Sequence, residues 1–161
     1  MAAEQAGTQP QSQQFTVQRI YVKDLSFESP STPAVFRKQW QPKLNVDLNT
    51  RSNAIDGDGN YEVVLSITIT AKLDEETAFL VEVQQAGIFF VKGFEGEDLR
   101  RILGTAAPNV LFPYARETLD SICVKGAFPP IVLAPVNFDA VYQQALLQAQ
   151  SAAKGGAPAT H

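Results

Sequence analysis

The side chains able to perform chemistry are few in this 161-residue chain, and their spacing disfavours catalysis. The single histidine, His161, is the last residue, and the single cysteine, Cys123, lies in an apolar helical pattern. A nucleophilic Cys/His or Ser/His pair and a Cys/His zinc cluster are therefore not expected. Residues 56–60, Asp-Gly-Asp-Gly-Asn, resemble part of a calcium loop, but they lack its closing Glu and read as a plain turn. The sequence thus predicts no enzyme, no metal and no cofactor.

The overall composition indicates one cytoplasmic domain. The formal net charge of −4 argues against binding to nucleic acid, which attracts basic surfaces. No apolar run approaches the ~20 residues that span a bilayer, and polar residues follow Met1 where a signal peptide would be apolar. We therefore predict no direct membrane insertion. A single cysteine is compatible with a reducing cytosol.

The elements that would have to position any site are four strands followed by helices. Residues 15–28 alternate between apolar and polar, but the alternation changes phase twice, which indicates bulges. Further strands are predicted at residues 44–48, at 61–70 and from 79 to 91, the last with a bulge or bend at Gly87. Short turns join the last three strands, and a proline-rich loop precedes them. This arrangement predicts an α+β fold with an antiparallel sheet of order 1-4-3-2 and two main helices packed on one face.

The helical part contains one long, unusually apolar segment. We expect it to begin between Pro108 and Pro113 and to end at Gly126, after a short helix around Leu99. Asn137 is predicted to cap the last helix. The single domain is expected to cover residues 15–150, with disordered ends at residues 1–14 and 151–161 because these lack large apolar side chains.

The chain carries more apolar surface than one copy can bury. The long helix is apolar on more than one face, so we expect a second copy to cover residues such as Leu111, Tyr114, Leu119 and Ile122. The proline-rich loop holds Phe36 and Trp40, and residues 128–135 form an apolar connector. These segments are either core and subunit interface or a groove for apolar segments of another chain. A carrier of a small apolar ligand is the alternative function.

The outward face of the predicted sheet is acidic. Strand alternation turns the carboxylates of five residues outward, with Leu80 beside one of them: Asp24, Glu28, Asp47, Glu62 and Glu82. Such a face is either a solvated sheet surface or a docking site whose affinity falls with salt.

Several collinear segments resemble the SecB protein-export chaperones. They cover roughly residues 15–147 and include Ile-Tyr-Val-Lys-Asp-Leu-Ser-Phe-Glu at 20–28 and Trp-Gln-Pro at 40–42. Further segments are Ala-Phe-Leu-Val-Glu-Val-Gln-Gln-Ala-Gly-Ile-Phe at 78–89, Asn-Val-Leu-Phe-Pro-Tyr-Ala-Arg-Glu at 109–117 and Leu-Ala-Pro-Val-Asn-Phe-Asp-Ala at 133–140. The resemblance implies an ATP-independent cytoplasmic homotetramer, a dimer of dimers, that binds unfolded precursor proteins and delivers them to the SecA translocation ATPase.

The resemblance also implies roles for individual residues. Four of them match the family's SecA-docking positions: Asp24, Glu28, Leu80 and Glu82. Four others match positions tied to tetramer packing: Phe79, Val81, Val83 and Gln85. The family's client groove lies between the proline loop and the helix connector, and we place six aromatic residues near it: Phe27, Phe36, Trp40, Phe128, Phe138 and Tyr142. The tail contains Lys154 and is less acidic than in many relatives, which leaves its contact with SecA open.

Overall fold

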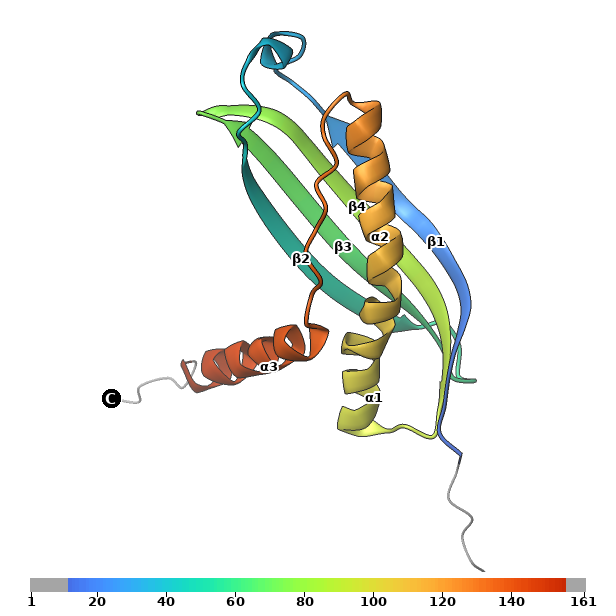
Figure 1. Cartoon of the computed structure of the whole chain (residues 1–161). Helices are drawn as coiled ribbons and strands as arrows, with labels where there is room; N and C mark the ends of the chain where they lie inside the picture. The colour runs from blue at the N-terminus through green and yellow to red at the C-terminus, as the bar shows by residue number, and fades with distance from the viewer. Residues whose placement is uncertain (1–11, 156–161) are drawn as a thin grey trace, which may run out of the picture.

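The structure, a computed structural model, describes residues 12–155 and contains a four-stranded antiparallel sheet crossed by helices on one face (Figure 1). The strands are β1 (Gln14–Glu28), β2 (Lys43–Ala54), β3 (Asn60–Leu73) and β4 (Glu76–Lys92), in the order β1-β4-β3-β2. The predicted fold class and strand order are confirmed. Short turns join β2, β3 and β4 into a meander, whereas the longer loop with the 3-10 helix η1 (Ala34–Arg37) takes the chain from β1 to the opposite edge.

Two bulges in β1 account for the changes of phase in its sequence. The pairing of β1 with β4 shifts between Val17 and Arg19 and again between Val22 and Asp24, so that one extra residue stands in β1 each time. Each extra residue returns the next apolar side chain to the face that the helices cover. The predicted phase changes are thus confirmed.

The core lies between the helices and the central strands β3 and β4. Alternate residues of these two strands face the helices and are fully buried, among them Leu65, Ile67, Ile69, Phe79, Val81 and Val83. Leu111 and Leu119 of the long helix are also fully buried and belong to the same cluster. Strand alternation at period two and helix spacing of three to four residues therefore meet in one apolar layer.

The long helix begins earlier than predicted. Helix α1 (Gly96–Gly104) leads almost directly into α2 (Ala106–Lys125), and together they cross the sheet (Figure 1). Pro108 lies in the first turn of α2, where a missing N–H is harmless, but Pro113 lies inside the helix. The predicted start between these prolines is therefore wrong. Burial of Leu111, Phe112 and Ala115 around Pro113 outweighs the hydrogen bond that proline removes.

Two glycines have packing roles that differ from the predicted ones. Helix α2 ends at Gly126 as expected, but its φ is −79°, and the left-handed residue is Ala127. A Cβ at Gly126 would lie 2.5 Å from the Phe27 ring, so glycine is needed for close contact. At Gly87, β4 continues in register with β3, so the predicted bulge is absent there; a Cβ at Gly87 would lie 3.1 Å from Leu111. Both glycines let the helical layer approach the sheet.

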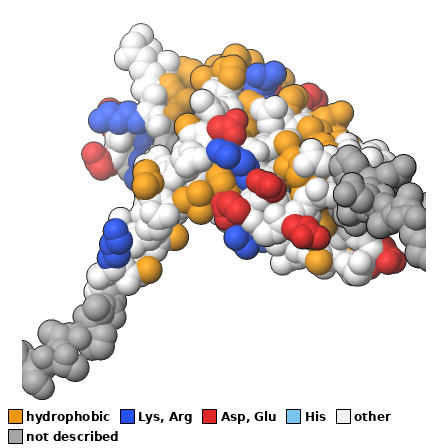
Figure 2. Space-filling view, turned by 90° about the horizontal axis from the view of Figure 1, so that it is seen from below, with side chains coloured by type: hydrophobic (Ala, Val, Ile, Leu, Met, Phe, Trp, Pro, Cys, Tyr) orange, Lys and Arg blue, Asp and Glu red, His pale blue; other side chains and the backbone are white. Residues whose placement is uncertain are grey.

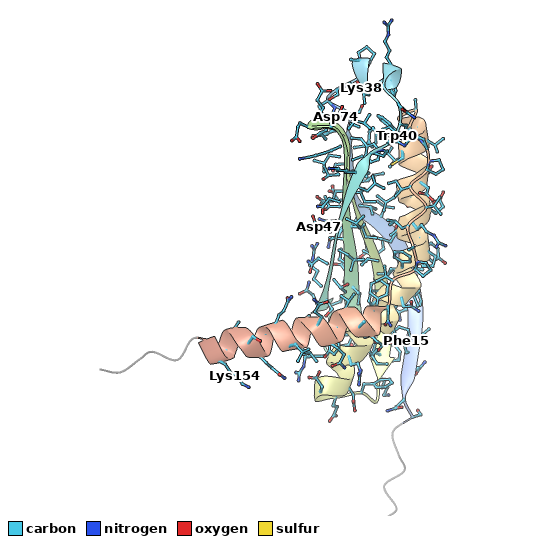
Figure 3. All side chains as sticks on the ribbon, turned by 60° about the vertical axis from the view of Figure 1, so that its left-hand side comes forward. Phe15, Lys38, Trp40, Asp47, Asp74 and Lys154 are labelled. Carbon is cyan, nitrogen blue, oxygen red and sulfur yellow. The ribbon has the colours of Figure 1, made fainter. Side chains whose placement is uncertain are left out.

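The last helix does not pack on the sheet as predicted. Helix α3 (Phe138–Gly155) contacts α1 and α2 near its start and then projects as an arm (Figures 1 and 3). Its amino-terminal cap is confirmed, because the Ala140 amide donates a hydrogen bond to Asn137 Oδ1 at 3.1 Å. Phe138 is buried, whereas Leu147 is 63% exposed. Apolar residues spaced three to four apart show that a helix is amphipathic, but they do not say what covers its apolar side.

Both predicted ends need a correction. Strand β1 begins at Gln14, the last residue of the segment 1–14 that was assigned to the disordered amino-terminal end. Helix α3 continues through residues 151–155, which were assigned to the disordered tail. Ala152, Ala153 and Lys154 are good helix formers, so the helix persists where the sequence loses its large apolar residues. The remainder of that tail and residues 1–11 of the amino-terminal extension lie outside the described residues. Among residues 12–155, no helix is long and apolar enough to cross a lipid bilayer.

Candidate functional site

An aromatic cluster stands at the carboxyl end of α2, built from segments that are distant in the sequence. Its five members are Phe27 of β1, Phe36 of η1, Trp40 of the loop before β2, Phe79 of β4 and Phe128 after α2. Phe128 is the centre, with ring centroids 5.0 Å from Phe79, 5.2 Å from Trp40 and 5.4 Å from Phe36. Phe128 is buried, but Phe36 is 50% exposed. The cluster is therefore part core and part surface.

The connector after the cluster is fixed to α2 by one carboxylate. Asp120 Oδ1 accepts hydrogen bonds from the backbone amides of Ile131 at 3.0 Å and Val132 at 3.1 Å. The connector consequently runs beside α2 toward α3 (Figure 1). Ile131 and Leu133 pack against the core, whereas Val132 is 71% exposed. One wall of the surface beside the aromatic cluster is thus held in place by Asp120.

The floor of this surface is the helix-side face of the edge strand β2. Leu44 and Val46 pair with Ala71 and Ile69 of β3, so their side chains point to the same side as the helices. Helix α2 contacts β3 and β4, and Leu44 and Val46 are each 44% exposed. In Figure 3 Trp40 lies on the helix side of the sheet, and Asp47 of β2 lies on the other. An apolar strip therefore continues from the cluster along β2.

The strip ends in a cleft between β2 and the projecting helix α3. The cleft has a volume of about 880 Å³, and its apolar lining includes Val46, Leu48, Leu103 and Val141. Figure 2, seen from below, shows hydrophobic side chains in the angle between the α3 arm and the body of the domain. Polar side chains such as Arg51, Arg100 and Gln144 line the rest of the cleft. An extended polypeptide, which has apolar side chains and a polar backbone, is the kind of ligand that matches a long, open surface of this mixed character.

The opposite face of the sheet carries an acidic patch formed by Asp24, Glu28, Leu80 and Glu82. The register pairs Glu28 with Leu80, Ser26 with Glu82 and Asp24 with Gln84. All four side chains thus lie on adjacent strands β1 and β4 and share one face. Leu80 is 37% exposed. The structure brings the four predicted docking residues together.

A polar network adjoins this patch on the same face. Glu62 of β3 accepts hydrogen bonds from the Tyr21 hydroxyl and from Lys23 Nζ, the latter at 2.6 Å. These bonds, with that from Lys23 contributing most, lower the pKa of Glu62, so its carboxylate is charged. Burial, and next the bond to Glu62, raises the pKa of Tyr21 to about 12. Glu62, predicted to point outward with the other carboxylates, is therefore neutralised by a neighbouring ammonium.

The described residues offer little material for catalysis. Burial, and to a lesser degree the charge of Asp120, raises the pKa of the Cys123 thiol to about 11. The thiol is thus protonated near neutral pH and is a poor nucleophile. Across residues 12–155, no group of three or more His, Cys, Asp or Glu side chains is placed to hold a metal ion.

Comparison with known proteins decides the family. Residues 8–149 match the family described as preprotein translocase subunit SecB. The chain belongs to the SecB family. It is 57% identical over 153 residues to the protein-export protein SecB of Marinobacter nauticus, covering 94% of this chain and 92% of that protein. The SecB of Azotobacter vinelandii is 53% identical over 156 residues, covering 96% of both chains. The family is one of protein-export chaperones.

A solved structure supports the fold of this SecB-family chain. A SecB-like chaperone from Mycobacterium tuberculosis, in complex with a peptide from an antitoxin, has a TM-score of 0.61 and 17% sequence identity. The match covers 76% of this chain and 87% of that protein. At this identity the likeness concerns the arrangement of sheet and helices.

The aromatic residues predicted for the client groove fall into two groups. Phe27, Phe36, Trp40 and Phe128 meet in the aromatic cluster. Phe138 instead packs edge-on against Phe112 at 6.0 Å, and Tyr142 donates a hydrogen bond to Glu97 Oε1 at 2.5 Å. Because Phe112 and Gly126 are about 20 Å apart along α2, this second group lies apart from the cluster. Tyr142 lines the cleft beside β2, so the two groups flank the same apolar strip at opposite ends.

The residues predicted for tetramer packing are mostly inside the protomer. Five of them are fully buried, because they lie between the sheet and α2: Phe79, Val81, Val83, Leu111 and Leu119. Gln85 is 3% exposed and donates to the Tyr21 carbonyl at 3.1 Å. Ile122 is half-buried, and Tyr114 is 51% exposed. Substitution of a buried member could therefore alter assembly only indirectly, by changing how β4 and α2 pack within the protomer.

Sequence reasoning missed three parts of the site. Phe79 was assigned to subunit packing, yet it also contacts Phe27, Trp40 and Phe128 in the aromatic cluster. Residues 44–48 were predicted as a strand, but the open apolar face at Leu44 and Val46 was not. The network around Glu62 was read as one more outward carboxylate. The second phase change in residues 15–28 was the one available signal for that network. It implies an extra residue near Lys23, which would place a lysine beside the acidic patch.

Proposed function

We propose that this chain is an ATP-independent chaperone that binds unfolded precursor proteins in the cytoplasm, keeps them export-competent and delivers them to the SecA translocation motor. The observation that supports it most is the aromatic cluster, whose member Phe36 is 50% exposed, continued by the apolar strip at Leu44 and Val46. Unfolded chains present apolar and aromatic side chains in an extended backbone, whereas folded proteins bury them. Selectivity for unfolded clients then requires no sequence readout and no substrate turnover.

The energetics favour many weak contacts. Each client side chain that becomes fully buried contributes about 1.5–3 kcal/mol, and ordering the client segment offsets much of this gain. A single segment is therefore expected to bind weakly. Several equivalent surfaces on one assembly raise the overall affinity through effective concentration, without any new kind of contact.

We infer that the assembly is a homotetramer, a dimer of dimers. The edge strand β1 carries partly exposed apolar side chains on its helix side, with exposures of 37% for Val17, 46% for Val22 and 39% for Leu25. On α2, Tyr114 and Val124 are 51% and 57% exposed. Apolar side chains along a strand edge and an adjoining helix suit contact with a second copy of the chain.

The acidic patch is the proposed docking site for SecA. Three carboxylates and Leu80 stand on two adjacent strands, on the face opposite the aromatic cluster. A cationic partner surface with an apolar pocket would complement this patch. Because the two surfaces lie on opposite faces of the sheet, a bound client and a docked motor need not compete.

Suppression of aggregation tests the client-binding proposal. A chemically unfolded client is diluted into buffer without nucleotide, and light scattering is followed with and without the chain. We expect suppression by the wild type and a clear loss with Phe36→Ser. Ile55→Ser is the matched control, because Ile55 lies in the β2–β3 turn and is 52% exposed, close to the 50% of Phe36.

Two outcomes would contradict the proposal. Failure of the wild type to suppress aggregation, combined with a monomeric mass in solution, would remove the chaperone function. A tight one-to-one complex with a small apolar molecule, together with indifference to unfolded protein, would instead favour the ligand-carrier alternative.

A further inference from the structure

The bulge at Lys23 decides which face of the sheet carries the acidic patch. Val22 pairs with Gln85 and Asp24 with Gln84, so Lys23 is the extra residue. Without it, strict alternation would turn Asp24 and Glu28 to the helix side and would turn Leu25 outward. Two of the four residues of the patch therefore depend on one irregularity in β1.

Glu62 holds this bulge by two contacts, one before it and one at it. The Tyr21 hydroxyl, two residues before the bulge, and Lys23 Nζ, at the bulge, both donate to the Glu62 carboxylate. Glu62 stands on β3, so the contacts span from β1 across β4. The Glu62 side chain is 19% exposed and the Lys23 side chain 40%, so the ion pair lies at the surface with its carboxylate partly covered. Two donors on one carboxylate make these charge-assisted hydrogen bonds more effective than a single exposed pair.

The face beneath the network is shaped to admit it. Tyr21 pairs with Ala86 of β4, and Ala86 pairs with Val64 of β3. Ala86 and Val64 lie on the face opposite the helices, yet both are fully buried. The small Ala86 methyl group leaves room for the Tyr21 side chain to pass over β4 and reach Glu62. The network thus covers an apolar spot of its own on this face.

Glu62 also directs the Lys23 ammonium, whereas the Arg51 guanidinium donates a hydrogen bond to Oε1 of Gln84, the residue that pairs with Asp24, at 3.3 Å. Lys23 and Asp24 are adjacent residues that the bulge places on the same face. An ammonium released from Glu62 would be within reach of the patch carboxylates and would reduce their negative potential. In the structure, Lys23 Nζ pairs with Glu62 Oε1 at 2.6 Å and is thereby directed away from the patch.

We propose that Glu62 is a positioning residue for the acidic patch: by accepting hydrogen bonds from Tyr21 and Lys23, it fixes the β1 bulge that presents Asp24 and Glu28 and withholds the Lys23 ammonium from them. This inference rests on the proposed docking of SecA at the patch. It assigns to Glu62 an indirect role, without contact with the motor.

The test compares three variants of the full chain with the wild type. Glu62→Gln removes the charge that holds the network. Glu95→Gln removes one carboxylate before α1, and the Glu95 side chain makes no cap hydrogen bond to that helix. Glu82→Lys alters the patch itself. Binding to SecA, suppression of client aggregation, and amide hydrogen exchange at residues 22–26 are measured for each. Tyr21→Phe serves as a second network variant if Glu62→Gln folds poorly.

We expect Glu62→Gln to weaken SecA binding about five- to tenfold and to speed exchange at residues 22–26, while client suppression stays unchanged. Glu95→Gln should match the wild type in all three measurements. A merely structural role would lower client suppression together with SecA binding.

The outcomes separate the inference from the proposed function. If Glu82→Lys abolishes SecA binding but Glu62→Gln binds as tightly as Glu95→Gln, the positioning role is wrong and the docking site stands. If neither the wild type nor Glu82→Lys binds SecA, the proposed docking site is wrong. Hydrogen exchange at residues 22–26 then still tests whether Glu62 fixes the bulge. Exchange at wild-type rates in Glu62→Gln and Tyr21→Phe overturns the inference in either case.

Discussion

The two faces of the sheet are built by different means. On the helix side, the aromatic cluster draws its members from β1, η1, the loop before β2, β4 and the connector after α2. On the opposite face, the acidic patch comes from β1 and β4 alone, whose register fixes its geometry. The first surface depends on tertiary packing and the second on strand pairing. Under the proposed function, residues of the first would serve both fold and binding, whereas most of the second can be changed without cost to the core.

The largest effect that would sharpen this comparison is on stability. Phe128→Ala should lower the free energy of unfolding by about 3–5 kcal/mol, because Phe128 is 4% exposed and contacts four other rings. Glu82→Lys should change it by no more than about 0.5 kcal/mol. Denaturant unfolding measures both. Equal destabilisation by the two variants would contradict the difference between the faces.

A smaller effect is expected at the connector. Asp120→Ala leaves the amides of Ile131 and Val132 without their acceptor and should cost about 1–3 kcal/mol. Because these amides hold the wall beside the aromatic cluster, hydrogen exchange at residues 131–132 should increase and client affinity should fall. Glu117→Ala, an exposed acidic position on the same helix, is the control. Unchanged exchange in Asp120→Ala would show that apolar packing alone fixes the connector.

The smallest effect separates the surfaces by their response to salt. Raising the ionic strength screens exposed charges and should weaken SecA binding about three- to tenfold. Client binding to the apolar surface should hold or strengthen under the same change, because burial of apolar area does not rely on charge. Titrations of each partner at low and high salt measure the two responses. Parallel loss of both affinities would mean that the surfaces are not chemically distinct.

Local patterns in the sequence were sufficient for the sheet. The phase changes in residues 15–28 located both bulges, because an extra residue flips every later side chain. The short turns between the last three strands also predicted the strand order. Strand alternation gathered Asp24, Glu28, Leu80 and Glu82 on one face.

Features that depend on packing between distant segments were not accessible. Helix α2 was predicted to begin between Pro108 and Pro113. Pro113 lies inside the helix instead, because its buried neighbours stabilise the helix around it. The apolar residues of α3 gave no indication that the helix projects as an arm. Phe138 and Tyr142 were grouped with Phe128 by aromatic type, although α2 separates them. The exposure of Leu44 and Val46 depends on how far α2 reaches across the sheet, which no local pattern contains.

The central claim is that client and motor occupy opposite faces of one sheet. Its most direct test is the affinity of SecA for the chain with and without a saturating amount of unfolded client. The account predicts a ternary complex and a SecA affinity that the client leaves essentially unchanged. Two results together would contradict it: SecA displaces the client in proportion to the SecA bound, and mutation of the aromatic cluster abolishes the binding of both SecA and client.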